Sequence, residues 1–196
     1  MKTTKRIISA LLSACFILSF TMIFSFATNH SLTSTLDLSA AAADEGDLET
    51  DGYHWDNANS TLTVKDLTIT LDNVTADGTA AIKLPGRDCK VIIEGTNKIA
   101  MTDKATASGS RYYGFHCVNN ISVSGSGTLD FAYTGNTDSN NENRFYGIYS
   151  EKELSLNGVT LSATASGYRR YSNIAEADGA LTITDSKLTA TGMEIC

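Results

Sequence analysis

Three places in the chain combine an arginine with a neighbouring aromatic ring, which suits the binding of sugars. They are Arg111-Tyr112, Arg144-Phe145 and Arg170-Tyr171. An arginine can bind the carboxylate of an acidic sugar through paired hydrogen bonds, and an aromatic ring offers a flat face for stacking. We therefore predict that these six residues bind a ligand. In the competing interpretation, the rings stack on one another and the arginines are solvated or pair with acidic neighbours.

An oxygen-rich segment at residues 136–143 is a candidate calcium site. It carries Asp138 and Glu142 among asparagines, a serine and a threonine. Calcium prefers several carboxylate and carbonyl oxygens, although the spacing here is not that of an EF-hand loop. Polar loops on acidic proteins commonly bind only water, so a hydrated loop is the competing interpretation.

No arrangement of residues singles out a catalytic centre. Hydrolysis of a sugar chain requires two carboxylates at a controlled separation, and Asp103, Asp130 and Glu142 form no evident pair. His54 and His116 have no serine, cysteine or aspartate at a spacing that would indicate a catalytic arrangement. We expect a protein that is not an enzyme, with a calcium-dependent polysaccharide lyase as the alternative activity.

The cysteines show no metal-binding pattern. They are Cys15, Cys89, Cys117 and Cys196, with no Cys-x-x-Cys pair. This spacing argues against a zinc site and against a dense disulfide framework. Cys89 and Cys117 fall in consecutive repeats, where they either bridge or remain as buried thiols.

The segments that must position these residues form a repeat. Five of them share the template apolar-x-apolar-x-(Gly/Asp), starting at Leu62, Val91, Ile121, Leu154 and Leu181, and a further apolar position follows each start by seven or eight residues. Alternation with period two predicts strands, and the Gly or Asp suits a tight corner. Since hairpin dipeptides are scarce, we predict an all-β fold, a parallel β-solenoid of about five coils, in preference to a β-sandwich.

The inward residues and the first end of this solenoid can also be predicted. Ile82, Phe115, Ile148 and Ile174 occupy equivalent places and should form an inward ladder, with His116 and Tyr149 facing outward. Trp55 precedes the first coil and is the candidate for an N-terminal cap, because terminal coils otherwise expose sheet edges. The chain stops one strand after a full coil, so we expect a domain truncated at its C-terminus.

The N-terminus has the pattern of a secretory signal. Lys2, Lys5 and Arg6 precede an apolar run over residues 7–26, and small residues offer cleavage points after Ala27 or at residues 40–43. We assign residues 1–43 to a signal peptide and spacer, and residues 44–196 to the β-helix domain. A retained membrane anchor and lipidation of Cys15 are the alternatives.

The charge balance narrows the partners. The chain of 196 residues has a net charge of −7, and removal of residues 1–43 takes away three basic residues and one acidic residue, which leaves about −9. An acidic protein does not attract nucleic acid or anionic lipid. We expect a secreted or cell-surface protein with no membrane span after signal removal.

The order of motifs resembles a known family. Tyr53-His-Trp55-Asp56, Leu62-Thr-Val64, residues 91–97 (VIIEGTN), the Tyr-Gly-Phe/Ile motifs at 113 and 146, and residues 121–129 (ISVSGSGTL) are similar to exported carbohydrate-binding domain-containing proteins of anaerobic Gram-positive bacteria. The resemblance runs from about Gly52 to Gly192. It implies a right-handed parallel β-helix similar in shape to pectate lyases. It also implies non-catalytic binding of plant cell-wall polysaccharide, notably acidic pectic chains, often with calcium.

Two functions from different classes follow. The first is a carbohydrate-binding protein, located at the cell surface or in the cell wall, and the second is a structural or adhesive solenoid whose partner is another protein. Binding to a polysaccharide, with and without calcium, separates the two.

Overall fold

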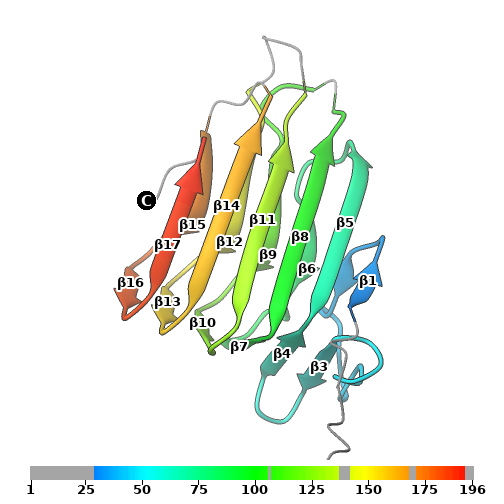
Figure 1. Cartoon of the computed structure of the whole chain (residues 1–196), viewed down its shortest axis with the longest axis vertical. Coiled ribbons are helices and arrows are strands. Elements are labelled where there is room, and N and C mark those ends of the chain that lie inside the picture. The colour runs from blue at the N-terminus through cyan, green and yellow to red at the C-terminus, as the bar shows by residue number, and fades with distance from the viewer. Residues whose placement is uncertain (1–28, 106, 137–141, 168–170, 193–196) are drawn as a thin grey trace, which may run out of the picture.

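The computed structural model describes residues 29–105, 107–136, 142–167 and 171–192 (Figure 1). In these ranges the fold is all-β, as predicted, and contains no helix. A search of the same ranges finds no helical segment long and apolar enough to cross a membrane.

The strands form three sheets. The first contains β1 (His30–Leu32), β5 (Leu67–Val74), β8 (Thr96–Asp103), β11 (Thr128–Thr134), β14 (Thr160–Ser166) and β17 (Lys187–Thr191). The second contains β3 (Tyr53–Asp56), β4 (Thr61–Lys65), β7 (Cys89–Glu94), β10 (Ile121–Ser124), β13 (Leu154–Asn157) and β16 (Leu181–Thr184). The third contains β2 (Leu36–Asp37), β6 (Thr79–Lys83), β9 (Arg111–Cys117), β12 (Arg144–Ser150) and β15 (Tyr171–Ala177).

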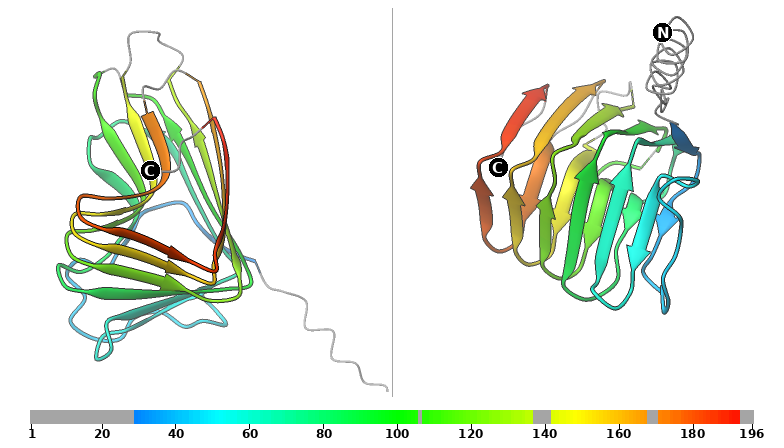
Figure 2. Two further views of the ribbon diagram at one scale, coloured as in Figure 1. Left: turned by 90° about the vertical axis from the view of Figure 1, so that its left-hand side faces the viewer. Right: turned by 60° about the horizontal axis from the view of Figure 1, so that its bottom comes forward.

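The chain visits the three sheets in turn. From β6 onward, every three consecutive strands add one strand to the third sheet, then one to the second and then one to the first. We call each such set of three strands a triplet. Neighbouring strands are parallel throughout the described sheets except for β3, which is antiparallel to β4. Viewed along the stacking direction, the three sheets form the sides of a triangle (Figure 2). Equivalent residues of successive triplets therefore lie one strand spacing apart.

The predicted corners lie between the second and first sheets. Asp66, Gly95, Gly125, Gly158 and Asp185 all have positive φ, between 48° and 118°. Glycine adopts this conformation without strain, and aspartate tolerates it better than most residues. The template position therefore marks the turn, as its chemistry predicts.

The predicted register is correct at most steps and wrong at one. Leu62 pairs with Val91, and Ile121 with Leu154 and onward to Leu181, as expected. However, Val91 pairs with Val123 instead of Ile121. A shift of two residues keeps the same side chains facing inward. Alternation alone therefore could not detect this shift.

The core lies between the sheets and is strongly apolar. Ile82, Phe115 and Ile148 are in register and buried, as predicted. The last member of the predicted ladder is wrong, because Ala175, and not Ile174, pairs with Ile148. Both Ala175 and Ile174 are fully buried, so the error exchanges two core positions.

Trp55 lies at the N-terminal edge of the second sheet. Its side chain is fully buried on the antiparallel strand β3, and the guanidinium of Arg87 lies 5.5 Å from the centre of its rings. This placement is compatible with the predicted capping role.

Two strands precede the domain boundary expected at residue 44. β1 pairs with β5 and β2 pairs with β6, and Leu38 after β2 is fully buried. Residues 30–38 therefore belong to the folded sheets and are not a spacer. The serine- and threonine-rich composition of this stretch hid the short strands, which carry few apolar residues.

Candidate functional site

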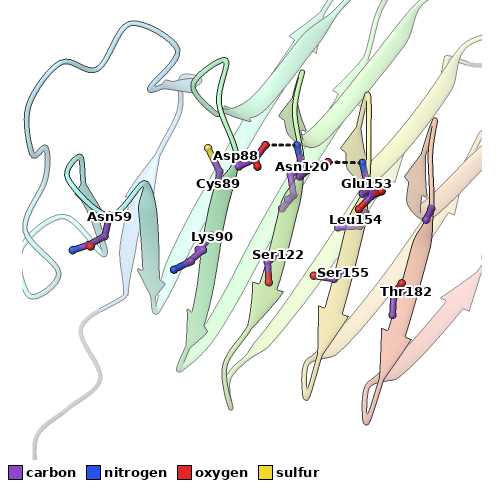
Figure 3. A pocket seen from close by; sticks show the side chains of 12 residues that line it. Asn59, Asp88, Cys89, Lys90, Asn120, Ser122, Glu153, Leu154, Ser155 and Thr182 are labelled. Carbon is purple, nitrogen blue, oxygen red and sulfur yellow. Dashed lines mark hydrogen bonds between the residues drawn. The ribbon is translucent and has the colours of Figure 1, made fainter.

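A groove hollows the outer face of the second sheet. Two adjoining hollows, of about 270 Å³ and about 470 Å³, share Asn59, Lys90 and Ser122. The first extends over β10, β13 and β16, and the second extends toward β3 and β4. The groove therefore crosses the strands and follows the direction in which the triplets are stacked (Figure 3).

One polar column runs along this groove. Lys90, Ser122, Ser155 and Thr182 are paired in register on β7, β10, β13 and β16. Their neighbours Val91, Val123 and Leu156 are buried because alternate side chains of a strand point to opposite faces. The alternation that builds the core therefore also builds a column of one amine and three hydroxyls in solvent.

A second column lies beside the first, two residues further along each strand. It consists of Thr63, Ile92, Ser124, Asn157 and Thr184, again in register. Ile92 supplies a half-buried apolar patch, and the other members supply hydroxyl and amide groups. The outer face of the second sheet, which is the floor of the groove, thus repeats hydrogen-bonding groups from one strand to the next.

Asp88, Asn120 and Glu153 form one rim of the groove. The backbone N–H of Asn120 donates to Asp88 Oδ1 at 3.3 Å, and the N–H of Glu153 donates to Asn120 Oδ1 at 3.1 Å (Figure 3). These bonds tie three successive turns together. The side-chain carboxylate of Glu153 is exposed and faces the groove.

The end of the groove next to β3 is also polar. His54, Asp56 and Asn59 line it. The side-chain amide and backbone N–H of Asn59 donate to Asp56 at 2.7 Å and 3.0 Å. These hydrogen bonds lower the pKa of Asp56, so this carboxylate is ionised at neutral pH. Together with Asp88 and Glu153, it gives the groove three carboxylates against the single amine of Lys90.

Two of the three aromatic residues predicted to contact sugar are not at the surface. Tyr112 and Phe145 are fully buried in the main core. The ring of Phe145 stacks on Tyr133, with centres 4.9 Å apart, and Tyr112 lies 6.2 Å from Tyr133. Neither ring is available to a sugar in this structure. The prediction is therefore wrong for these two rings. They pack on Tyr133, whereas the competing interpretation had the rings of the three pairs stacking on one another.

The arginines are aligned in part. Arg111 pairs with Arg144 across β9 and β12, as predicted. Arg144 pairs on its other side with Tyr171, so Tyr171 occupies the place expected for an arginine and the third pair is out of register by one residue. Arg170 lies outside the described residues. Arg111 and Arg144 lie on the third sheet, and neither lines the groove of the second sheet.

A stack of three tyrosines lies on the third sheet. This stack was not predicted from the sequence. Tyr113, Tyr146 and Tyr149 form an apolar cluster separate from the core, with ring centres 5.1–5.5 Å apart. His116 stacks on Tyr113 at 4.6 Å. Each tyrosine is less than 8% exposed, because the rings cover one another. The stack therefore offers little ring face to a ligand.

The tyrosine stack is fixed by acidic neighbours. The hydroxyl of Tyr149 donates to Asp178 at 2.8 Å, and His116 Nε2 lies 3.1 Å from Glu151. Burial and this hydrogen bond raise the pKa of Tyr149. The outward orientation predicted for His116 and Tyr149 agrees with these contacts.

The expected calcium ligands cannot be assembled from the described residues. Asp138 lies outside them, and Glu142 is exposed, with its backbone N–H bonded to the hydroxyl of Ser108 at 3.0 Å. The ranges that the structure describes contain no group of three or more acidic, histidine or cysteine side chains able to hold a metal. The nearby buried carboxylate of Asp103 accepts four hydrogen bonds from protein donors, so both of its oxygens already have partners. Calcium binding at residues 136–143 therefore stays a prediction, because Asp138 lies outside the described residues.

Comparison with known proteins adds no assignment to this geometry. No family model, no curated protein and no solved structure matches the chain.

Proposed function

We propose that the protein is an exported, non-catalytic carbohydrate-binding protein whose polysaccharide ligand lies along the groove of the second sheet. The observation that carries this proposal is the pair of polar columns in strand register. A polymer with a regular repeat can meet an equivalent hydroxyl or amide at each strand that it crosses. A small ligand would use only part of such a surface.

The proposal includes the finer description of the fold. The cyclic order of the strands and their parallel pairing support a right-handed parallel β-helix of about five coils, with β3 and Trp55 at its N-terminal cap. In such a fold, every coil adds one rung to the groove. The length of bound polysaccharide then follows from the number of coils.

The charges of the groove favour an uncharged polysaccharide. Asp56, Asp88 and Glu153 outnumber Lys90 along its walls, and a polyuronate would meet like charges there. Carboxylates accept hydrogen bonds from sugar hydroxyls, and the hydroxyls of serine and threonine both donate and accept them, without this repulsion. We therefore propose a neutral cell-wall chain in place of the acidic pectic chain that the family resemblance implies.

A binding assay on immobilised polysaccharides tests the proposal. The full chain is applied to galactan, arabinan, xyloglucan and polygalacturonate, with and without calcium. We expect retention on at least one neutral polysaccharide, independent of calcium. Absence of binding to all of them would overturn the proposal in favour of a protein partner, and calcium-dependent binding to polygalacturonate alone would overturn the choice of an uncharged ligand.

A further inference from the structure

Two cysteines meet at a corner beside the groove. Cys89 begins β7 in the second sheet, and Cys117 ends β9 in the third sheet, so they belong to consecutive triplets. Both are free thiols, and both are almost completely buried. The turn at residues 84–88 leads into Cys89 and also carries Asp88 of the groove rim.

The two sulfur atoms share the same surroundings. Sγ of Cys89 lies 3.2 Å from the carbonyl oxygen of Arg87 and 3.8 Å from that of Pro85. Sγ of Cys117 lies 3.5 Å from each of these two oxygens. Because both sulfur atoms contact the carbonyl oxygen of Arg87, they lie less than about 7 Å apart.

The two neighbouring thiols also shift each other's pKa through side-chain hydrogen bonding. This interaction, together with burial, raises the pKa of Cys89, and the same interaction lowers the pKa of Cys117. Cys117 is therefore the more acidic of the two thiols, and a thiolate is the species that attacks a disulfide. A thiolate held next to a second thiol is the arrangement from which a disulfide forms.

We propose that Cys89 and Cys117 form a disulfide that joins consecutive triplets and fixes the turn at the groove rim. During folding, before the two thiols are buried, the Cys117 thiolate attacks an oxidising disulfide, such as oxidised glutathione or the disulfide of a thiol-oxidising protein, and expels one thiolate. Cys89 then displaces the second thiol, so the two cysteines lose two protons and two electrons and the oxidant becomes two thiols. In the cell this reaction depends on the proposed export, because disulfides persist in oxidising compartments.

Peptide mapping tests the linkage independently of export. The full chain is refolded in a glutathione redox buffer, its remaining thiols are alkylated, and it is digested with trypsin without reduction. Cleavage after Arg87, Lys90, Arg111 and Arg144 leaves the two cysteines in separate peptides, residues 88–90 and 112–144. We expect these two peptides to be joined. Free alkylated Cys89 and Cys117, or a link from either to another cysteine, would overturn the proposal.

Thermal unfolding separates a disulfide from buried thiols that only pack well. A bond closing this loop should raise the Tm of the oxidised protein roughly 5–10 °C above that of the reduced protein. The doubly substituted Cys89→Ser/Cys117→Ser chain should lose this dependence on reductant, and a Cys196→Ser control should keep it. Equal Tm values for oxidised and reduced wild type would contradict the proposal. The peptide map decides the question even if the double variant fails to fold.

The peptide map detects a covalent bond and does not depend on ligand binding. The disulfide can therefore be absent from a protein that binds polysaccharide, or present in one that does not.

Discussion

The hydroxyl of Tyr112 donates a hydrogen bond of 3.1 Å to Oδ1 of Asp103 inside the core. Oδ2 of the same carboxylate accepts from Tyr133 at 3.1 Å and from Asn143 at 2.7 Å, and Oδ1 also accepts from the N–H of Ala105 at 2.7 Å. A buried charge is tolerated when hydrogen bonds compensate it in this way. Tyr112 is therefore a structural residue that ties β9 to β8.

Removal of this carboxylate should destabilise the fold strongly. Asp103→Ala removes the acceptor of four hydrogen bonds in the core, and we expect a loss of about 3 kcal/mol or more in the free energy of unfolding. Tyr112→Phe removes one hydrogen bond and should cost about 1–2 kcal/mol. Urea unfolding measures both. Tyr112→Phe with wild-type stability but weakened polysaccharide binding would contradict the structural role.

Alkaline pH should destabilise the protein. Burial raises the pKa of Tyr112 to about 12 from an ordinary value of 10, so the folded state holds this proton more tightly than the unfolded state. The resulting stability is fully present below pH 10 and is lost as the pH rises toward 12, by roughly 2–3 kcal/mol. Urea unfolding at pH 9 and pH 11 measures about half of this loss, because pH 11 lies midway between the two pKa values.

The Tyr112→Phe variant is the control for the pH experiment. The pKa values of Tyr113 and Tyr149 are also raised, with burial as the largest cause, so the variant should retain part of the pH dependence. Its loss of stability between pH 9 and pH 11 should be smaller than that of the wild type. Equal losses would show that Tyr112 is not the titrating group.

Two corner glycines form a matched pair for substitution. Gly125 has a φ of 118°, and a Cβ there would lie 2.2 Å from the carbonyl oxygen of Ile93. Gly158 has a φ of 67°, with nothing within 4 Å of its Cβ position. We expect Gly158→Ala to cost about 1–2 kcal/mol from backbone strain alone, and Gly125→Ala to cost clearly more. Equal losses in chemical unfolding would contradict the close approach at Gly125.

The mature N-terminus should lie at Thr28. Cleavage after Ala27 retains β1 and β2, whereas cleavage after Ala43 would remove both strands and the fully buried Leu38. Mass spectrometry of the exported protein measures the N-terminus. A chain beginning at Asp44 would contradict this prediction, and a lipid on Cys15 would show that the N-terminus is processed by the other route considered.

The repeat could be predicted because each corner carries its own chemistry. Asp66 and Gly158 mark turns with positive φ, and such turns require residues that tolerate this conformation. The strands between them follow from alternation. The register of β7 against β10 did not follow, because a shift of two residues changes no inward or outward face.

The positions of the aromatic residues could not be predicted from alternation. Tyr112 and Phe115 both face the core, although three positions separate them. Gly114 lies between them, and a Cβ there would approach the ring of Phe131 to 2.4 Å. Gly114 and Phe115 therefore both face the core although they are consecutive, and Tyr113 faces outward into the tyrosine stack. Counted from the inward Phe115, period two assumes an unbroken strand and assigns Tyr112 and Tyr113 to the wrong faces.

The polar column of the groove has a signal in the sequence, a polar residue at the outward position of successive templates. Ser122, Ser155 and Thr182 are the outward members of the same templates whose inward members define the core. Aligning the outward positions would have shown the polar column. The shallow hollow over it depends on how the turns stack, and that stacking required the structure.

Substitution in the groove tests the central proposal most directly. Ser122→Tyr and Ser155→Tyr each place a bulky ring on the groove floor, and Thr164→Tyr places the same ring on an exposed outer position of β14 in the first sheet. Affinity is measured by titration with whichever neutral polysaccharide (galactan, arabinan or xyloglucan) retains the wild type. We predict that both groove variants raise Kd at least about tenfold, while Thr164→Tyr leaves it unchanged. Wild-type affinity in the groove variants, with all three proteins folded, would contradict binding along this face.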